Sequence, residues 1–214
     1  MELQMNRMHT HKSNLALKYI RGHFATSHSH TNYYIDITTL KTRLSEAELV
    51  ARELVGHYRS STVVDTILCL DDTQVIGACL AKELTAAGFM SLNAHETIYV
   101  LTPEYDAGGN ILFRDNTAPM VRGKNVLILM ASVSSGITMA QSIECVGYYG
   151  GRVAGLSAIY SSISEVSGIP VMSVFNQEEL PDYGSYKPHD CPLCRQGVKI
   201  DALVNCYGYS LLQK

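Results

Sequence analysis

The sequence predicts an α/β fold in which a central, mostly parallel sheet is flanked by helices. Short continuous apolar runs such as Val126–Met130 are typical of strands that are buried on both faces of a parallel sheet. Segments with helical periodicity alternate with these runs along the chain. The 214 residues, 46% of them apolar, suit one α/β domain with a sizeable core.

The expected elements can be placed in order along the chain. Residues 1–12 are polar and are expected to be frayed, whereas residues 15–20 are expected to form a short helix. Ser45-Glu46-Ala47-Glu48 matches the capping box that begins a helix. The remaining expectations are strands over 63–70, 96–101, 126–130, 153–159 and 170–175, helices over 75–87 (ended by Gly88) and 139–148, a loop over 103–119, and a last strand or short helix within 202–212.

Composition and charge exclude several classes of function. A net charge of −3 predicts neither a nucleic-acid partner nor a membrane-surface partner. No apolar stretch approaches the length of a membrane span, and residues 1–12 do not resemble a secretory signal. Cys69 and Cys79 lie in apolar segments and are expected to be small core residues, which indicates a reducing, cytoplasmic setting.

The segment that follows the 126–130 strand has the composition of a phosphate-binding turn. Ser134, Ser135, Gly136, Ile137 and Thr138 lead directly into the helical segment. A glycine lets the backbone approach an anion, hydroxyls donate hydrogen bonds, and the unpaired N–H groups at a helix start point at the anion. The alternative is an ordinary strand-to-helix turn.

This segment resembles the ribose-phosphate loop of the type I phosphoribosyltransferases. That family has a strand, two acidic residues, two small or apolar residues, two Thr or Ser, Gly, any residue and Thr. The match covers the phosphate-gripping half of the loop, whereas Met130 and Ala131 occupy the positions of the acidic pair. The resemblance implies a type I phosphoribosyltransferase-like fold, and the substitutions leave the catalytic residues unassigned.

The segment from Gly22 to Asp36 resembles the N-terminal signature of the orotate phosphoribosyltransferases. In that subfamily this segment forms a hood over the base, and His28 stands where the subfamily usually has Gly. The resemblance assigns the hood and base site to Phe24, Ser27, Tyr33 and Tyr34. The alternative is a polar hairpin whose Tyr33 and Ile35 alternate toward the core.

The family's pyrophosphate loop falls on a turn that carries Asp71, Asp72 and Thr73. One like-charge pair at about 4 Å costs about 4 kcal/mol at a surface-like dielectric constant, so these carboxylates would oppose pyrophosphate unless a divalent cation lay between them. The favoured alternative is that they cap the helix that follows. The family's mobile loop also differs, because Arg114 is the only basic residue of the 103–119 loop.

The C-terminal tail contains Cys191 and Cys194 in a Cys-x-x-Cys motif, which is half of a zinc site. His189 or Cys206, or a second subunit, could complete a structural Zn²⁺ site. The alternative is a pair of buried free thiols, and the late position of the motif disfavours redox activity.

Together these observations give one domain with three parts, an N-terminal tail and hood over 1–40, a phosphoribosyltransferase-like core over 41–175 and a C-terminal tail over 176–214. The resemblance implies a homodimer that transfers a phosphoribosyl group to a pyrimidine, with Mg²⁺ if the chain is active. One alternative is a non-catalytic binder of a nucleoside monophosphate or phosphosugar. Another is a different transferase or hydrolase that uses a metal at Asp71 and Asp72.

Overall fold

The computed structural model describes residues 4–9, 15–86, 91–94 and 97–212. The chain divides into two compact units. Unit 1 consists of Met1–Thr39 together with Phe175–Lys214, and unit 2 consists of Leu40–Val174. None of the helices in the described ranges is long and apolar enough to cross a membrane.

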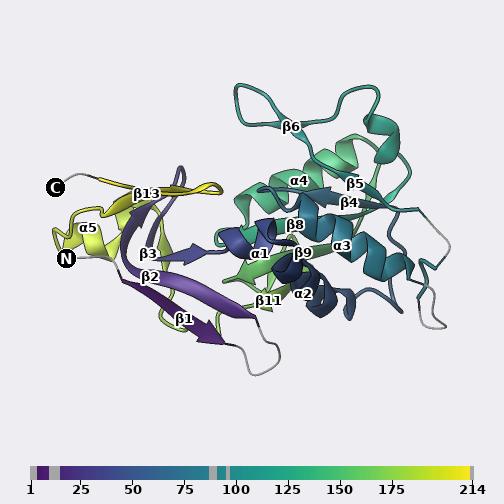
Figure 1. Ribbon diagram of the computed structural model, residues 1–214. Coiled ribbons are helices and arrows are strands. Elements are labelled where there is room, and N and C mark those ends of the chain that lie inside the picture. The colour runs from purple at the N-terminus through teal and green to yellow at the C-terminus, as the bar shows by residue number, and fades with distance from the viewer. Residues whose placement is uncertain (1–3, 10–14, 87–90, 95–96, 213–214) are drawn as a thin grey trace. The chain divides into compact units, whose positions relative to one another are not determined.

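Unit 1 is built on one sheet to which both ends of the chain contribute (Figure 1). The strand order is β12-β3-β2-β13-β14, and β1 pairs with the other part of β2. Its elements are β1 (Met5–His9), β2 (Ala16–Ala25), β3 (His30–Asp36), β12 (Ser185–Tyr186), the 3-10 helix η2 (Pro188–Asp190), α5 (Pro192–Arg195), β13 (Ala202–Asn205) and β14 (Gly208–Leu211).

Two expectations for the N-terminal segment are wrong. Residues 16–20 belong to strand β2 rather than to a helix, and residues 5–9 form strand β1 rather than a frayed end. The two strands pair antiparallel, with Met5 opposite Ile20 and His9 opposite Ala16. The physical reason is that Leu15 and Leu17 are buried two residues apart, which is the period of a strand.

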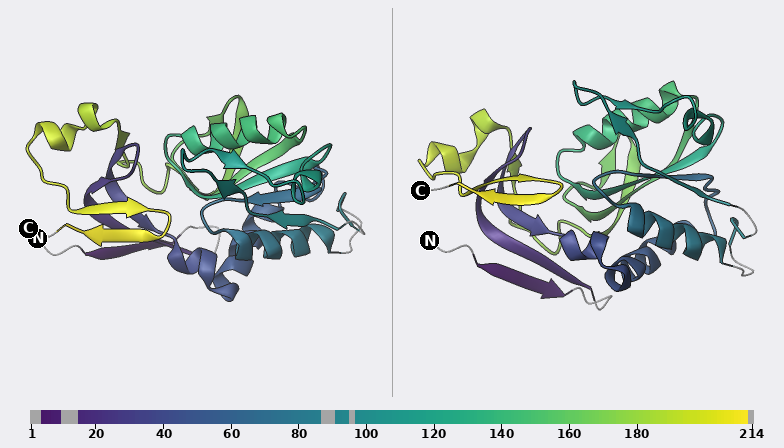
Figure 2. Two further views of the ribbon diagram at one scale, coloured as in Figure 1. Left: turned by 90° about the horizontal axis from the view of Figure 1, so that it is seen from above. Right: turned by 45° about the horizontal axis from the view of Figure 1, so that its top comes forward.

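Unit 2 contains a six-stranded sheet of order β10-β11-β9-β8-β4-β5, in which β5, β4, β8 and β9 are parallel to one another. Figure 2 shows α4 on one face of this sheet and α2 and α3 on the other. Helix α1 (Thr38–Thr42) contains the boundary between the two units in the sequence. The further elements of unit 2 are α2 (Leu44–Val55), β4 (Thr66–Cys69), α3 (Gln74–Thr85), β5 (Tyr99–Leu101), β6 (Glu104–Tyr105), β7 (Ile111–Leu112), the 3-10 helix η1 (Ala118–Met120), β8 (Asn125–Val133), α4 (Ile137–Tyr148), β9 (Arg152–Ser161), β10 (Glu165–Val166) and β11 (Ile169–Phe175).

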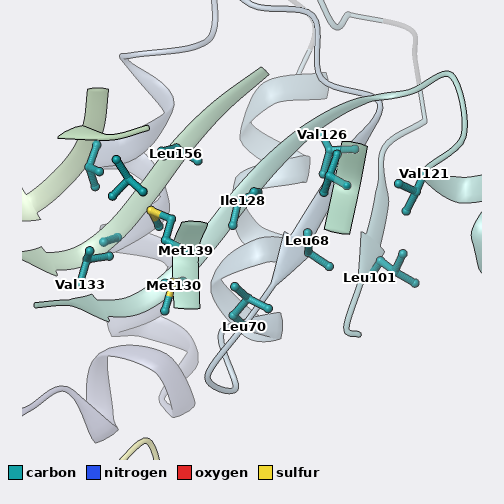
Figure 3. Close-up of a cluster of buried hydrophobic side chains, with 14 of the residues drawn as sticks. Leu68, Leu70, Leu101, Val121, Val126, Ile128, Met130, Val133, Met139 and Leu156 are labelled. Carbon is teal, nitrogen blue, oxygen red and sulfur yellow. The ribbon is translucent and has the colours of Figure 1, made fainter. Parts of the chain in front are cut away.

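The core of unit 2 confirms the α/β prediction. Strand β8 is buried along nearly its whole length, as its continuous apolar run predicts. One apolar cluster joins Val126, Ile128 and Met130 of β8 to Met139 of α4 (Figure 3). Val146 of α4 belongs to the same cluster. This packing holds the start of α4 against the end of β8, which is where the phosphate-binding turn was predicted.

Some details of unit 2 differ from the predictions. Helix α2 begins at Leu44 with Arg43 as its N-cap and without a side-chain cap, so the predicted capping box is wrong. Glu46 pairs instead with Arg43, at 3.3 Å. The predicted 103–119 loop contains the β6–β7 hairpin and η1. Gly88, the predicted end of the α3 helix, and residue 96, the predicted start of a strand, lie outside the described residues.

Replacing Gly77 by Ala is expected to destabilise unit 2 because α3 lies very close to β4 at this residue. A Cβ at Gly77 would lie 2.3 Å from Sγ of Cys69. Overpacking of this kind typically costs about 1–3 kcal/mol. Gly147→Ala in α4 is the matched control, since its Cβ would meet nothing within 4 Å and Ala favours helix. Urea denaturation of both variants measures the difference, and equal stabilities would contradict the packing.

Candidate functional site

The turn between β8 and α4 is the candidate phosphate-binding loop. Gly136 is the N-cap of α4 and has a left-handed backbone, with φ of 73°. A Cβ there would lie 3.0 Å from both Cδ1 of Ile163 and Cγ2 of Val166. Glycine is therefore required by its backbone angle, which a residue with a Cβ rarely adopts, and by the close approach of these two side chains.

Several donors at this turn are available to a ligand. The first N–H groups of the twelve-residue helix α4 have no partner within the helix, and Gly136 provides no side-chain cap. Within the described ranges, the hydroxyls of Ser134, Ser135 and Thr138 make no hydrogen bond to protein. The backbone carbonyl of Ser134 accepts a hydrogen bond from the Ser162 hydroxyl, and that of Thr138 accepts one from the Ser142 hydroxyl. Ser135 and Ile137 are exposed. The loop can therefore offer backbone and hydroxyl donors to an anion.

The acidic-pair position holds no carboxylate. Met130 is 5% exposed and Ala131 is 2% exposed, and Met130 lies in the apolar cluster shown in Figure 3. Mg²⁺ prefers oxygen ligands, which these two side chains lack. The position therefore does not fit a resident Mg²⁺.

The Asp71–Asp72 turn is held by a buried lysine. Lys41 of α1 is 4% exposed, and its Nζ donates to the Asp71 carbonyl at 2.8 Å and lies 3.6 Å from Oδ2 of Asp72. Both aspartates have left-handed backbones, with φ of 53° and 61°. The N-cap of α3 is Thr73, whose hydroxyl donates instead to the Leu70 carbonyl, so the interpretation of the carboxylates as helix caps is wrong. Nothing in the sequence singled out Lys41.

Ionisation of the Asp71 carboxyl group destabilises the folded protein. Burial raises its pKa, against the opposing effects of Lys41 and of the hydrogen bond from the Ala131 backbone. A carboxyl group whose pKa is higher in the folded protein than in the unfolded chain contributes its full stabilisation below the unfolded-state pKa of 3.8. This stabilisation is lost as the pH rises through the folded-state pKa.

Asp71→Asn is therefore expected to become progressively more stable than the wild type as the pH rises from about 4 to 7. Asn tolerates the left-handed backbone and can accept the Ala131 hydrogen bond, so the change isolates the charge. Urea denaturation at several pH values measures the difference. A stability difference that is constant across this range would contradict the assignment of the cost to the charge.

Arg114, the single basic residue of the 103–119 segment, is paired with Glu104 of the β6–β7 hairpin. Arg114 donates from Nε to Oε2 of Glu104 at 2.6 Å and from Nη2 to Oε1 of the same carboxylate. This pairing lowers the pKa of Glu104. The hairpin turn is held by Asp106, which accepts from the backbone of Gly108 and Asn110. Arg114 is thus paired with Glu104 of β6.

The predicted hood residues are placed mainly in the core of unit 1. Phe24 is fully buried, and it packs with Tyr34 at a ring separation of 6.1 Å. Burial raises the pKa of Tyr34 to about 12, with a smaller contribution from Asp36, so this phenol stays neutral. Ser27 lies exposed at the β2–β3 turn. Phe24 and Tyr34 therefore have an evident packing role, whereas Ser27 is accessible.

Unit 1 also contains a pocket that the sequence did not reveal. Its volume is about 1010 Å³, and Tyr33 forms part of its wall. Arg21 lies over the Tyr33 ring at 5.3 Å from the centroid and 3.9 Å from Oδ2 of Asp182, and both of these residues also line the pocket. Only the folded sheet brings residues near both chain ends together here, which explains why no local pattern indicated the pocket.

The Cys-x-x-Cys motif lies next to two histidines that the sequence analysis did not consider as ligands. Ligand atoms of His23, His30, Cys191 and Cys194 all lie within 4.8 Å of one another, so this cluster could hold a metal. His189, a predicted ligand, is instead 3.1 Å from Asp190, and Cys206 lies exposed outside the cluster. The histidines come from β2 and β3, more than 160 residues before the cysteines.

Comparisons with known proteins agree with the predicted resemblance. The chain is 26% identical over 184 residues to the orotate phosphoribosyltransferase of Chlorobaculum parvum, which covers 85% of this chain and 86% of that protein. The structure of orotate phosphoribosyltransferase from Mycobacterium tuberculosis in complex with inorganic phosphate matches this chain with a TM-score of 0.50 and 17% identity. The match covers 70% of this chain and 81% of that one. UMP synthase of Leishmania donovani matches 71% of this chain and 32% of its own, with a TM-score of 0.50 and 21% identity. No protein-family model matches the chain.

Proposed function

We propose that this chain, which has the type I phosphoribosyltransferase fold and resembles the orotate enzymes in sequence, binds a ligand that carries a 5′-phosphoribosyl group. Residues 134–138 would grip the 5′-phosphate. The observation that carries this proposal is the left-handed Gly136 at the start of α4, beside three hydroxyls without protein partners in the described ranges. Such a turn favours anions because backbone donors and the helix dipole both point at the ligand.

An orotate-type transfer reaction is the activity that the relatives suggest. It would join a pyrimidine nitrogen to C1 of the ribosyl group with loss of pyrophosphate, which makes the chain a pentosyltransferase if it is active. Mg²⁺ would then arrive with the pyrophosphate donor, since Met130 and Ala131 provide no oxygen ligands. Positioning of the two substrates would supply much of the rate.

A non-catalytic binder is the second candidate, and three features of unit 2 favour it. The acidic-pair position is apolar and buried. The Asp71–Asp72 turn is held by Lys41 and presents carboxylates where a pyrophosphate would have to bind. Arg114 is paired with Glu104. With no oxygen ligand at the acidic-pair position, carboxylates at the pyrophosphate-loop position and a paired Arg114, few groups would stabilise a leaving pyrophosphate, whereas the proposed 5′-phosphate loop is unaffected.

Isothermal titration with three ligands separates these candidates. Orotidine monophosphate and Mg-phosphoribosyl pyrophosphate should both bind if the chain is a transferase, and an absorbance assay should then detect orotate consumption. Binding of the monophosphate without binding of the pyrophosphate donor supports the second candidate. Inorganic phosphate tests the loop alone, and failure of all three ligands to bind would contradict both candidates.

We also propose that the protein is cytoplasmic and forms a homodimer. All six cysteines are without disulfides, which suits a reducing compartment. The homodimer follows from the resemblance to orotate phosphoribosyltransferases, and light scattering on the purified protein tests it. A mass of 23.5 kDa across the micromolar range would indicate a monomer and contradict this part of the proposal.

A further inference from the structure

We propose that His23, His30, Cys191 and Cys194 form a structural Zn²⁺ site that joins the two chain segments of unit 1. The cluster combines two thiols and two imidazoles, which is a common ligand set for structural zinc. It lies within unit 1 and is separate in the sequence from the phosphate loop, so it goes beyond the proposed function.

Four of the six distances between ligand atoms are close to those of a tetrahedral site, and all six lie within 4.8 Å. Nε2 of His23 lies 3.2 Å from Nδ1 of His30, 3.5 Å from Sγ of Cys191 and 3.7 Å from Sγ of Cys194. Nδ1 of His30 lies 3.2 Å from Sγ of Cys194. Zinc bonds of about 2.0–2.3 Å arranged tetrahedrally separate neighbouring ligand atoms by about 3.3–3.8 Å.

Nε2 of His23 has more neighbours in the cluster than it can hydrogen-bond at one time. Nδ1 of His23 lies 2.8 Å from the Val198 carbonyl, to which it can only donate, so in the neutral ring Nε2 carries one lone pair. That lone pair faces three neighbours, namely the Nδ1 of His30 and both sulfurs. One cation at the centre would satisfy all four atoms. The Val198 bond is also the kind of outer contact that fixes the tautomer of a zinc-bound histidine.

Burial and charge also suit Zn²⁺. His23 and Cys191 are each 1% exposed, whereas Cys194 is exposed, so the site would be closed on the inner side and reachable by a metal on the outer side. Both thiols would release their protons to water on binding. Two thiolates and two neutral imidazoles then balance the 2+ charge, so no net charge would be buried.

The local backbone presents both cysteines on one short turn. Cys191 precedes α5 as its N-cap, and Pro192 occupies the first helical position, where its fixed φ is tolerated. Gly197, with φ of 71°, turns the chain back after the helix. On the other side of the site, the His23 backbone N–H donates to Oδ2 of Asp201 at 2.9 Å. These contacts hold the ligands in place without a metal bond.

The metal would strengthen a weak connection between the two segments of unit 1. Strands β2 and β13 pair at only two positions, Phe24 with Ala202 and Ala25 with Leu203. Strands β3 and β12 also pair at two positions. Small scaffolds with limited cores commonly need a metal or a disulfide for stability. Chelation should therefore lower the melting temperature of the protein.

Metal analysis of protein purified under reducing conditions, from cells grown with added zinc, tests the site. We expect about one zinc per chain, as for a single closed structural site. Cys194→Ser and His30→Asn should each lower zinc content at least tenfold. Cys206→Ser and His189→Asn are matched controls, since both residues lie outside the cluster, and they should keep the full zinc content.

Cobalt titration of the metal-free wild type gives a readout that needs no variant to fold. Tetrahedral Co²⁺ bound by thiolates should show visible absorption bands and a thiolate charge-transfer band, which added Zn²⁺ should abolish. Wild-type protein without stoichiometric zinc, or without these bands, would overturn the proposal. So would controls that lose zinc to the same extent as the two cluster variants.

Discussion

Lys41→Met is expected to lower the free energy of unfolding by about 1.5–3 kcal/mol at pH 7. Lys41 is buried but Asp72 is 45% exposed, so water screens the charge that remains, and the expected loss is mainly that of the charged hydrogen bond to the Asp71 carbonyl, typically about 1.5–3 kcal/mol. Lys41 is 4% exposed and contacts both the Asp71 carbonyl and the Asp72 carboxylate. Its charge also opposes the rise in the pKa of Asp71 that burial causes. Urea denaturation measures the loss.

Two further variants identify the origin of this loss. Lys82→Met removes an exposed lysine of α3 and should change stability by at most about 0.5 kcal/mol, as is usual for surface substitutions. Adding Asp71→Asn to Lys41→Met should recover part of the stability, because the two groups are coupled. A Lys41→Met protein as stable as the Lys82→Met control would show that the lysine does not hold the turn.

Gly136→Val is expected to abolish measurable binding of inorganic phosphate and of orotidine monophosphate. Valine does not readily adopt the φ of 73°, and its side chain would enter space already occupied by Ile163 and Val166. The turn would have to change shape, and a loss of only 1.4 kcal/mol already weakens binding about tenfold. Isothermal titration of the folded variant provides the measurement.

Gly123→Val is the control for the backbone effect alone. Gly123 has nearly the same φ, 71°, but a Cβ there would meet nothing within 4 Å, and it precedes β8 rather than α4. This variant should lose some stability through strain and keep its affinity for phosphate. Unchanged phosphate binding by Gly136→Val would mean that the ligand binds elsewhere.

The sequence predicted those parts of the fold that local patterns determine. The continuous apolar run gave β8, the helical periodicity gave α3 and α4, and the glycine between strand and helix gave the turn at Gly136. These features depend on residues that are near one another in the chain. The alternation of strands and helices was likewise sufficient for the α/β class.

The features that the sequence did not predict depend on contacts between distant residues. Lys41 reaches the Asp71 turn across 30 residues, and His23 reaches Cys191 across 168. Local patterns do not show that two such segments meet in the fold. The predicted helix over 15–20 failed for a similar reason, because pairing with β1 and β3 determines the conformation of β2.

A crystal structure of the protein with orotidine monophosphate tests the central claim most directly. We predict the phosphate at the start of α4, with its oxygens about 3 Å from the backbone nitrogens and hydroxyls of residues 134–138. The Gly136 backbone should keep its left-handed conformation. A monophosphate bound away from this turn, or a turn filled by its own side chains, would contradict the account.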